Sequence, residues 1–190
     1  YGASLSGGSG DYARGTLDFN KQIGESTAIR ITGMGNENNT VGRNDVYSHR
    51  WGIAPSIAFG LGKRTTFTLE YFHQTDNRIP DYGVPVITKP GTTIARPATE
   101  YGLNRNNWYG TSYDQDVSNV DMLTGRLKFD LSKYITLYND LRGGLYSRYF
   151  SASPPGCDTT CAAEFFTNPA AAQVNRRGHL GGPEPYQQND

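Results

Sequence analysis

The alternation of side chains between Tyr47 and Leu61 predicts one long strand. Every second residue from Tyr47 onward is bulky and mostly apolar, whereas the residues between them, such as Ser48 and Arg50, are small or polar. Because successive side chains of a strand point to opposite faces, this period of two indicates a strand that is wetted on one side only. The run is much longer than the usual strand of about five or six residues. It fits a strand tilted across a bilayer, which needs roughly nine to eleven residues.

The same alternation predicts other strands. They cover residues 12–20, 27–34, 47–61, 65–75, 117–131 and 134–149, and residues 1–8 are expected to hold the end of another strand and a Gly-rich turn. The alternation is lost over residues 76–116, where prolines from Pro80 to Pro97 exclude a central strand. Residues 150–190 are rich in Ala, Pro, Gly and Asn. We expect both stretches to be long loops.

Two regularities indicate the architecture. Short connections near residues 25, 62 and 133 alternate with longer ones near 40, 95 and 170, as in transmembrane barrels with short periplasmic turns and long extracellular loops. Aromatic residues also form two groups: Phe19, Phe59, Phe67 and Phe129 lie beside the short turns, and Tyr47, Trp51, Tyr71 and Tyr149 lie toward the long loops. We therefore expect an all-β fold, an antiparallel up-and-down transmembrane β-barrel. The chain would supply an incomplete portion of about six or seven strands.

The charged residues of the predicted strands support a barrel. Those on the polar faces are Arg14, Asp18, Arg30, Arg50, Glu70, Arg126, Lys128, Asp130, Asp140 and Arg142. A charge facing lipid at the bilayer midplane costs about 2 to 4 kcal/mol, so we expect the charges to face a wet lumen. The alternative is a soluble sandwich with charged outer faces. Sorted aromatic groups and one-sided long loops favour the barrel.

Composition narrows the possibilities further. The chain has 190 residues with 18 basic and 18 acidic side chains, so it is one domain or part of one and lacks the basic surplus of a nucleic-acid-binding protein. Without an apolar run of about eighteen residues or a charged-then-apolar opening stretch, we expect neither a transmembrane helix nor a secretory leader within this sequence. Because the chain begins with Tyr1 rather than Met, we expect it to be part of a longer protein.

Several stretches resemble the barrel of TonB-dependent ferric-siderophore receptors, in particular the catecholate type. These stretches are Arg50–Leu61, Thr65–Gln74, Ile79–Pro85 with its sequence IPDYGVP, Tyr101–Gly102 and Leu141–Arg142. The resemblance implies a barrel of about 22 strands with a plugged lumen in the outer membrane of a Gram-negative bacterium. Such a receptor imports a ferric siderophore with energy from the TonB complex. Its partners would be the siderophore, TonB and outer-membrane lipid, and its iron would be carried only as the chelate, without a cofactor.

The resemblance also predicts how the chain is divided. Residues 1–150 would be a partial barrel with extracellular loops at 36–45 and 76–116. Residues 151–190 would be an extracellular loop segment leading to a missing strand. Compared with the family, we expect the plug domain, the TonB box and the terminal strand to be missing from this stretch of sequence.

Ligand binding is expected in the long loops. The candidates are Arg78, Asp81, Tyr82, Tyr101, Arg105, Trp108, Tyr109 and Tyr113, with Asn104 among them and Arg176 and Arg177 as weaker candidates. A ferric tris-catecholate is an anion with flat faces, so guanidinium groups can pair with its charge while aromatic rings stack on it. The alternative is that these aromatic residues pack the loop against itself.

The two cysteines, Cys157 and Cys161, lie four residues apart in the last loop. In an exported protein we expect them to form a disulfide. A metal site is the alternative, but two thiols without a nearby His are too few for tetrahedral zinc.

No catalytic motif is present, and His49, His73 and His179 are far apart in sequence, so we expect neither an enzyme nor a metal site. A passive porin would share every feature of the strands. A soluble carbohydrate-binding β-sandwich is a third hypothesis.

Overall fold

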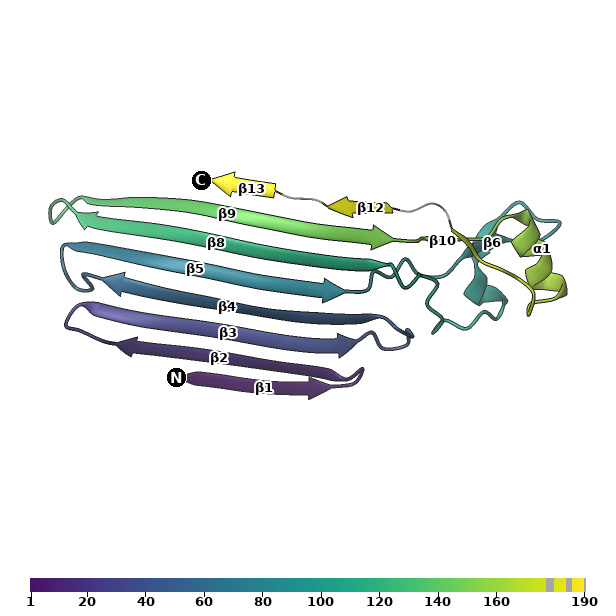
Figure 1. Ribbon diagram of the computed structural model, residues 1–190, viewed down its shortest axis with the longest axis horizontal. Helices are drawn as coiled ribbons and strands as arrows, with labels where there is room; N and C mark the ends of the chain where they lie inside the picture. The colour runs from purple at the N-terminus through teal and green to yellow at the C-terminus, as the bar shows by residue number, and fades with distance from the viewer. Residues whose placement is uncertain (177–179, 184–185, 190) are drawn as a thin grey trace.

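The computed structural model describes residues 1–176, 180–183 and 186–189, and most of them form one large antiparallel sheet (Figure 1). The sheet has nine strands, of which the short β12 and β13 both pair with β9. The strands are β1 (Gly2–Gly8), β2 (Tyr12–Gln22), β3 (Thr27–Asn39), β4 (Tyr47–Phe59), β5 (Thr65–Arg78), β8 (Gln115–Asp130), β9 (Thr136–Ala152), β12 (Leu180–Pro183) and β13 (Tyr186–Asn189). The all-β, up-and-down fold class is confirmed, with β1 and β12–β13 as the edges of an open sheet.

The remaining elements lie beyond one end of the sheet, at the right of Figure 1. They are β6 (Val86–Thr88) paired with β7 (Ala95–Pro97), a 3-10 helix (Ala98–Tyr101), β10 (Pro155–Gly156) paired with β11 (Asn175–Arg176), and α1 (Thr159–Thr167). We call this group, with the connections around it, the loop head. Among the described residues, no helix has the length and apolar character needed to cross a membrane.

Every strand pair in the sheet shares one parity. Odd-numbered residues pair with odd-numbered residues and even with even, from β1 through β9 to β13. One face of the sheet therefore carries only odd-numbered side chains. Large apolar side chains lie exposed on that face, including Trp51 (52%), Ile53 (40%) and Leu123 (52%). This is the apolar face that the alternation predicted.

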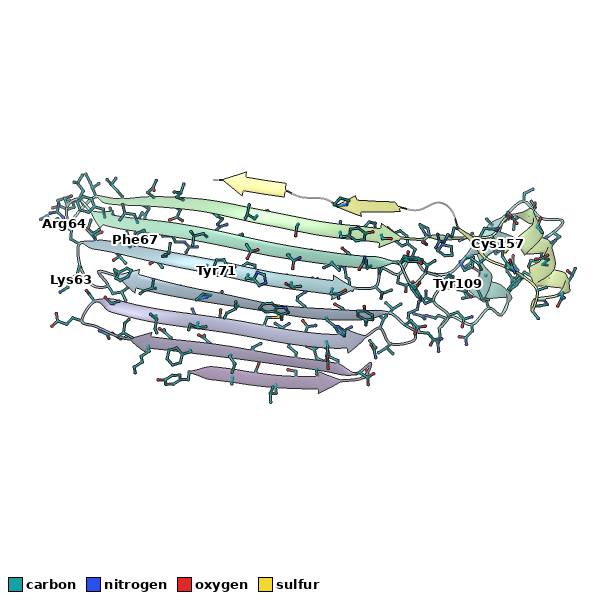
Figure 2. The ribbon with its side chains drawn as sticks, viewed as in Figure 1. Lys63, Arg64, Phe67, Tyr71, Tyr109 and Cys157 are labelled. Atoms are coloured by element: carbon teal, nitrogen blue, oxygen red, sulfur yellow. A yellow bond between two sulfur atoms is a disulfide. The ribbon has the colours of Figure 1, made fainter. Side chains whose placement is uncertain are left out.

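Phenylalanines mark the end of the sheet opposite the loop head. Phe59 of β4 pairs with Phe67 of β5, and Phe129 lies opposite Thr65 at the same level. Tyr71 was expected toward the long loops, but it lies near the middle of β5 (Figure 2). The aromatic residues on the odd face that do lie toward the loop head include Tyr47, Trp51 and Tyr149.

The odd face also carries charges that the sequence analysis did not single out. Lys21 and Glu37 lie near the ends of β2 and β3, but Asp121 lies in the middle part of β8, opposite His73 of β5 and Leu145 of β9. Its carboxylate accepts a hydrogen bond from the Tyr71 hydroxyl (2.5 Å) and lies 2.8 Å from His73 Nδ1. The expectation that strand charges avoid the apolar face therefore has an exception, and this exception is satisfied by polar partners on the same face.

Two local features explain the turn and pairing around β4. Gly60 has φ +70°, and a Cβ there would lie 2.0 Å from the carbonyl oxygen of Thr65, so only glycine fits this turn. Pro55 lies within β4 although proline is rare in central strands. The register between β4 and β5 passes from Ile53 to Ser56 without pairs at the two positions between them. The sheet accommodates Pro55 because β4 lacks backbone pairing with β5 at residues 54 and 55.

The observed boundaries differ from the predicted loops. Because β3 continues to Asn39, the loop expected at 36–45 covers only residues 40–46. Because β5 ends at Arg78 and β8 begins at Gln115, the loop expected at 76–116 covers residues 79–114. Both faces of these strand ends are polar, so the alternation of apolar and polar residues by which the strands were predicted is absent there. The segment 151–190 was expected to be a loop before a missing strand. It instead contains α1 and returns along β9 as β12 and β13.

Candidate ligand-binding site

The loop head is held to the sheet by Arg43, which the sequence did not single out. Arg43 lies in the 40–46 connection, and its side chain is only 8% exposed. It donates two hydrogen bonds to Asp81 (2.7 and 2.6 Å) and others to the backbone carbonyls of Gly83 (3.1 Å) and Arg105 (2.5 Å). Asp81 and Arg105 belong to the same long loop, so Arg43 fixes two distant parts of that loop against a neighbouring connection.

The contact with Arg43 favours the ionised form of the Asp81 carboxyl. Its burial raises the pKa, but hydrogen bonds from Arg43 and the Gly83 N–H, together with the Arg43 charge, outweigh that effect and hold the pKa below its ordinary value. Trp108 also supports the loop, since its indole Nε1 donates to the carbonyl of Pro80 (3.3 Å). Asp81 and Trp108, both predicted as ligand-binding residues, thus have structural roles here.

Asp114 is a second anchor. It is 2% exposed and accepts hydrogen bonds from the N–H and hydroxyl of Thr111 and from the N–H (3.0 Å) and hydroxyl (2.8 Å) of Ser153. The contact joins the end of the 79–114 loop to the start of the segment after β9. A buried carboxylate with four donors is strongly fixed, because leaving it unsatisfied would be costly.

A cavity of about 500 Å³ lies between the 79–114 loop and the segment after β9 that contains α1. Its walls include Tyr101 and Tyr109 from the 79–114 loop and Phe165 and Phe166 from α1. The rings of Phe166 and Tyr101 meet edge to face with centroids 5.1 Å apart, and Phe165 meets Phe166 in the same way at 5.3 Å. A concave, mostly apolar space of this size with a few polar groups is typical of small-molecule sites.

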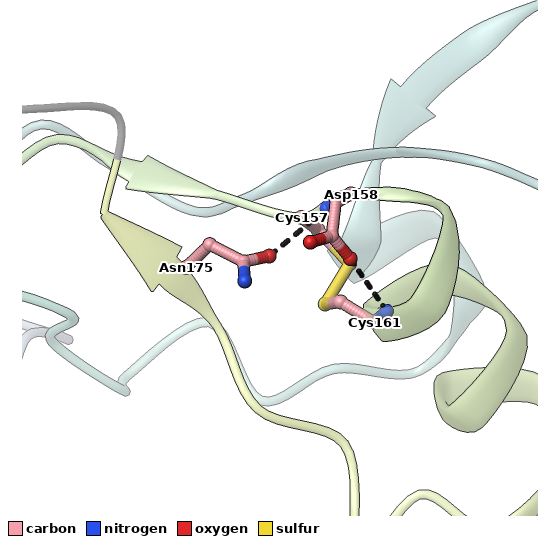
Figure 3. Close-up of a disulfide and its surroundings, with 4 residues drawn as sticks. All are labelled: Cys157, Asp158, Cys161 and Asn175. Atoms are coloured by element: carbon pink, nitrogen blue, oxygen red, sulfur yellow. Dashed lines mark hydrogen bonds between the residues drawn. A yellow bond between two sulfur atoms is a disulfide. The ribbon is translucent and has the colours of Figure 1, made fainter.

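A disulfide between Cys157 and Cys161 forms part of the cavity wall (Figure 3). Asp158 caps α1, since its carboxylate accepts from the Cys161 N–H (2.9 Å), and its own N–H donates to the Asn175 side chain (3.0 Å). The disulfide and the cap fix the first turn of a helix that is too short to be stable alone. They hold the two phenylalanines of α1 in the cavity wall.

Arginines lie on the even face of the sheet just below the loop head. Arg78 and Arg148 both donate to the nearly buried carboxylate of Asp116, with distances of 2.6 to 3.0 Å. On the neighbouring pair of strands, Arg50 donates to Asp76. The side chain of Arg78 remains 47% exposed. The even face therefore offers guanidinium groups near the entrance from the loop head.

The structure divides the predicted site residues into separate groups. Tyr101, Asn104 and Tyr109 line the cavity, Arg78 lies on the sheet, and Asp81 and Trp108 hold the loop together. Tyr82, Arg105 and Tyr113 have exposed side chains. Arg176 lies in β11, and Arg177 lies outside the described residues.

The sequence analysis missed Arg43, Asp114, Phe165 and Phe166. The adjacent phenylalanines in an Ala-rich stretch after a potential Asp158 N-cap were the available signal. In the part of the chain that the structure describes, no group of three or more His, Cys, Asp or Glu residues could hold a metal ion.

A sheet with one exposed apolar face, an opposite face lined with ion pairs and long loops at one end is typical of part of the wall of a transmembrane β-barrel. The chain matches no protein-family model. It is 40% identical over 146 residues to the catecholate siderophore receptor Fiu of Escherichia coli, covering 74% of this chain and 19% of that protein. It is 36% identical over 141 residues to the probable TonB-dependent siderophore receptor PiuA of Acinetobacter baumannii, covering 72% and 18%.

Solved structures agree with the sequence matches. The closed form of the ferric-catecholate import receptor Fiu of Escherichia coli superposes with a TM-score of 0.73 at 29% identity, covering 98% of this chain and 26% of that one. The siderophore receptor PiuA of Acinetobacter baumannii gives a TM-score of 0.71 at 30% identity, covering 80% and 22%. The predicted resemblance is confirmed: the chain corresponds to a segment of the barrel of TonB-dependent siderophore receptors. It spans about a fifth of the length of the curated relatives.

Proposed function

We propose that this chain is part of an outer-membrane receptor that takes up a ferric siderophore, of the catecholate type, in a TonB-dependent manner. The observation that carries the proposal is the 40% identity to a catecholate siderophore receptor over most of the chain, supported by the same strand arrangement in solved relatives. The strands would form wall and lumen, and the loop head would face the medium.

The two faces of the sheet support a location in a membrane. The exposed apolar odd face would contact outer-membrane lipid of a Gram-negative bacterium, and the even face, with its ion pairs, would face the lumen. The TonB complex would act through a plug region of the whole receptor. Iron would enter as the substrate chelate, so the chain would need no cofactor and would perform no catalysis.

Recognition of an anionic chelate would depend on exposed cationic and aromatic side chains. Arg105, Tyr82 and Tyr113 are exposed in the loop head, and Arg78 lies below them on the even face. Guanidinium groups pair with the charge of the chelate, and aromatic rings stack on its flat faces. Arg105, Tyr82 and Tyr113 are better candidates than Asp81 and Trp108, whose polar groups already bind other parts of the loop. Arg78 pairs with Asp116 but keeps 47% of its side chain exposed.

The proposal is tested by iron uptake in cells. The intact receptor should be expressed in a Gram-negative strain without its own catecholate receptors, and uptake of radioactive iron supplied as a ferric tris-catecholate should be measured with and without TonB. We expect uptake only when both the receptor and TonB are present. Uptake that continues without TonB would indicate a passive porin, and recovery of the receptor in the soluble fraction would indicate a soluble sandwich.

Ligand recognition is tested separately. Replacing Arg105 with Ala in the intact receptor should weaken ferric-catecholate binding several-fold, because an exposed charge contact contributes about 1 kcal/mol. Arg96→Ala is the matched control, since Arg96 is also exposed in the same loop but pairs with Glu100. Equal affinities in both variants would remove Arg105 from the site.

A further inference from the structure

The loop-head cavity differs chemically from the surface proposed for the ferric chelate. None of the described residues that line it is Asp, Glu, Lys, Arg or His. The nearby cation Lys89 lies over the ring of Phe166, with its Nζ 5.9 Å from the centroid, and is not part of the lining. An anion buried here would have no partner of opposite charge in the walls, and burying an uncompensated charge is strongly unfavourable.

The groups that do line the cavity suit an aromatic ring. Phe165, Phe166 and Tyr101 all line the cavity, and the ring of Phe166 is nearly perpendicular to those of Phe165 (84°) and Tyr101 (80°). Aromatic pairs prefer such tilted arrangements, so a ring entering the cavity can pack against either phenylalanine. Ile87 and Val174 add apolar side chains to the walls.

A few neutral polar groups are available for hydroxyl groups of a ligand. Asn107 and Tyr109 both line the cavity. The Asn107 side-chain amide donates to the Tyr109 hydroxyl over 3.4 Å, which is long for a hydrogen bond. Both groups can donate and accept, so a ligand hydroxyl can replace this weak contact at little cost.

We propose that the cavity between the 79–114 loop and α1 is a binding site for an uncharged, metal-free phenolic ring. Phe165 and Phe166 hold the ring, and Asn107 and Tyr109 bind its hydroxyl. This site is separate from the arginines of the even face and goes beyond the proposed uptake of an anionic ferric complex.

The experiment compares two probes that differ in charge and do not chelate iron tightly. 4-Hydroxybenzyl alcohol is neutral at pH 7, whereas 4-hydroxybenzoate carries a carboxylate that is ionised there. Both are added to the intact receptor in detergent, and binding is measured by saturation-transfer NMR with empty micelles as the blank. We expect the neutral probe to bind at least about tenfold more tightly than the anionic probe.

Two variants locate the site. Phe166→Ala removes a wall and should weaken binding of the neutral probe about tenfold. Ala172→Phe adds a ring to the lining without removing a contact and should block the cavity. Ile94→Ala is the matched control, because Ile94 is a large apolar residue of the same loop that is 61% exposed and not part of the lining.

A third variant tests the charge argument directly. Asn107→Lys places a cation in the lining, so 4-hydroxybenzoate should gain affinity at least about fivefold while the neutral probe does not. Equal binding of the two probes to the unaltered receptor would overturn the proposal, as would unchanged neutral-probe binding in both Phe166→Ala and Ala172→Phe. Ferric-catecholate uptake is measured independently, so either proposal can fail without the other.

Discussion

Single buried polar side chains determine how the loop head is built. Arg43 and Asp114 together make hydrogen bonds to three separate segments, yet both lie in polar stretches that look like solvated loops in the sequence. Periodicity cannot reveal such residues, because their importance depends on partners far away along the chain. The predicted candidates Tyr101 and Tyr109 do meet in one cavity, but their aromatic partners Phe165 and Phe166 come from a segment more than fifty residues later.

The first prediction concerns Arg43. Replacing it with Ala leaves the Asp81 carboxylate without its guanidinium and two backbone carbonyls without a donor, so the loop should lose about 1.5 to 3 kcal/mol of local stability. Limited proteolysis of the intact receptor should then cleave residues 79–114 roughly tenfold faster or more. Arg96→Ala, which removes an exposed ion pair, should leave the cleavage rate nearly unchanged. Similar rates in the two variants would contradict the role of Arg43.

The second prediction concerns pH. The folded structure lowers the pKa of Asp81, so its contribution to loop stability is complete above the ordinary Asp value of 3.8 and is lost as the pH falls below it. Pepsin, which is active in acid, should therefore cleave the loop progressively faster from about pH 4 downward. The Asp81→Asn variant should lack this step because it has no titrating group there. A step of the same size in that variant would assign the effect to other carboxyls.

At the scale of elements, the strands were predictable and the helix was not. Each long strand repeats its alternation often enough to be recognised, and errors occur at ends such as Asn36–Asn39, where both faces are polar. By contrast, α1 has only nine residues, and helices of this length are unstable in isolation. Its existence depends on the Asp158 cap, the disulfide and packing around the cavity. The cap and the cysteine pair can be read from the sequence, but the packing cannot.

The third prediction concerns the disulfide. Replacing Cys157 and Cys161 with Ser removes a short covalent loop that is worth about 2 kcal/mol in a chain-entropy model. Proteolysis within residues 157–175 should accelerate, and the neutral phenolic probe should lose affinity. Thermal unfolding of the barrel should not change, because α1 lies in the loop head beyond the end of the sheet (Figure 1). A lowered barrel melting temperature would show that the loop head supports the wall.

At the scale of the whole molecule, the two faces of the sheet have separate environments. Odd-numbered side chains form one exposed apolar surface, whereas even-numbered ones form ion pairs such as Arg30 with Asp18 and Arg126 with Glu70. This segregation was predictable because it repeats in every strand. The odd position of Asp121 is visible in the alternation, but its compensation by Tyr71 and His73 could not be foreseen, since it depends on the register between β5 and β8.

The fourth prediction compares two adjacent positions in β4. Ile57 is on the odd face and Ser56 on the even face, where it pairs with Glu70 of β5. Ile57→Arg should destabilise the folded receptor in lipid by up to about 2 to 4 kcal/mol, whereas Ser56→Arg should change stability much less. Denaturant unfolding in lipid vesicles measures the difference. Equal losses in both variants would contradict a lipid-facing odd surface.

The shared parity of the sheet has a consequence for which length changes the protein can accept. Removing one residue from inside β5 would exchange the faces of all residues beyond the deletion, turning Glu70 or Arg78 toward hydrocarbon and Leu69 or Tyr71 toward water. Removing two would restore the faces and only slide the strand. Natural variants of this barrel should therefore carry single-residue insertions and deletions in the connections, while those within strands should come in twos.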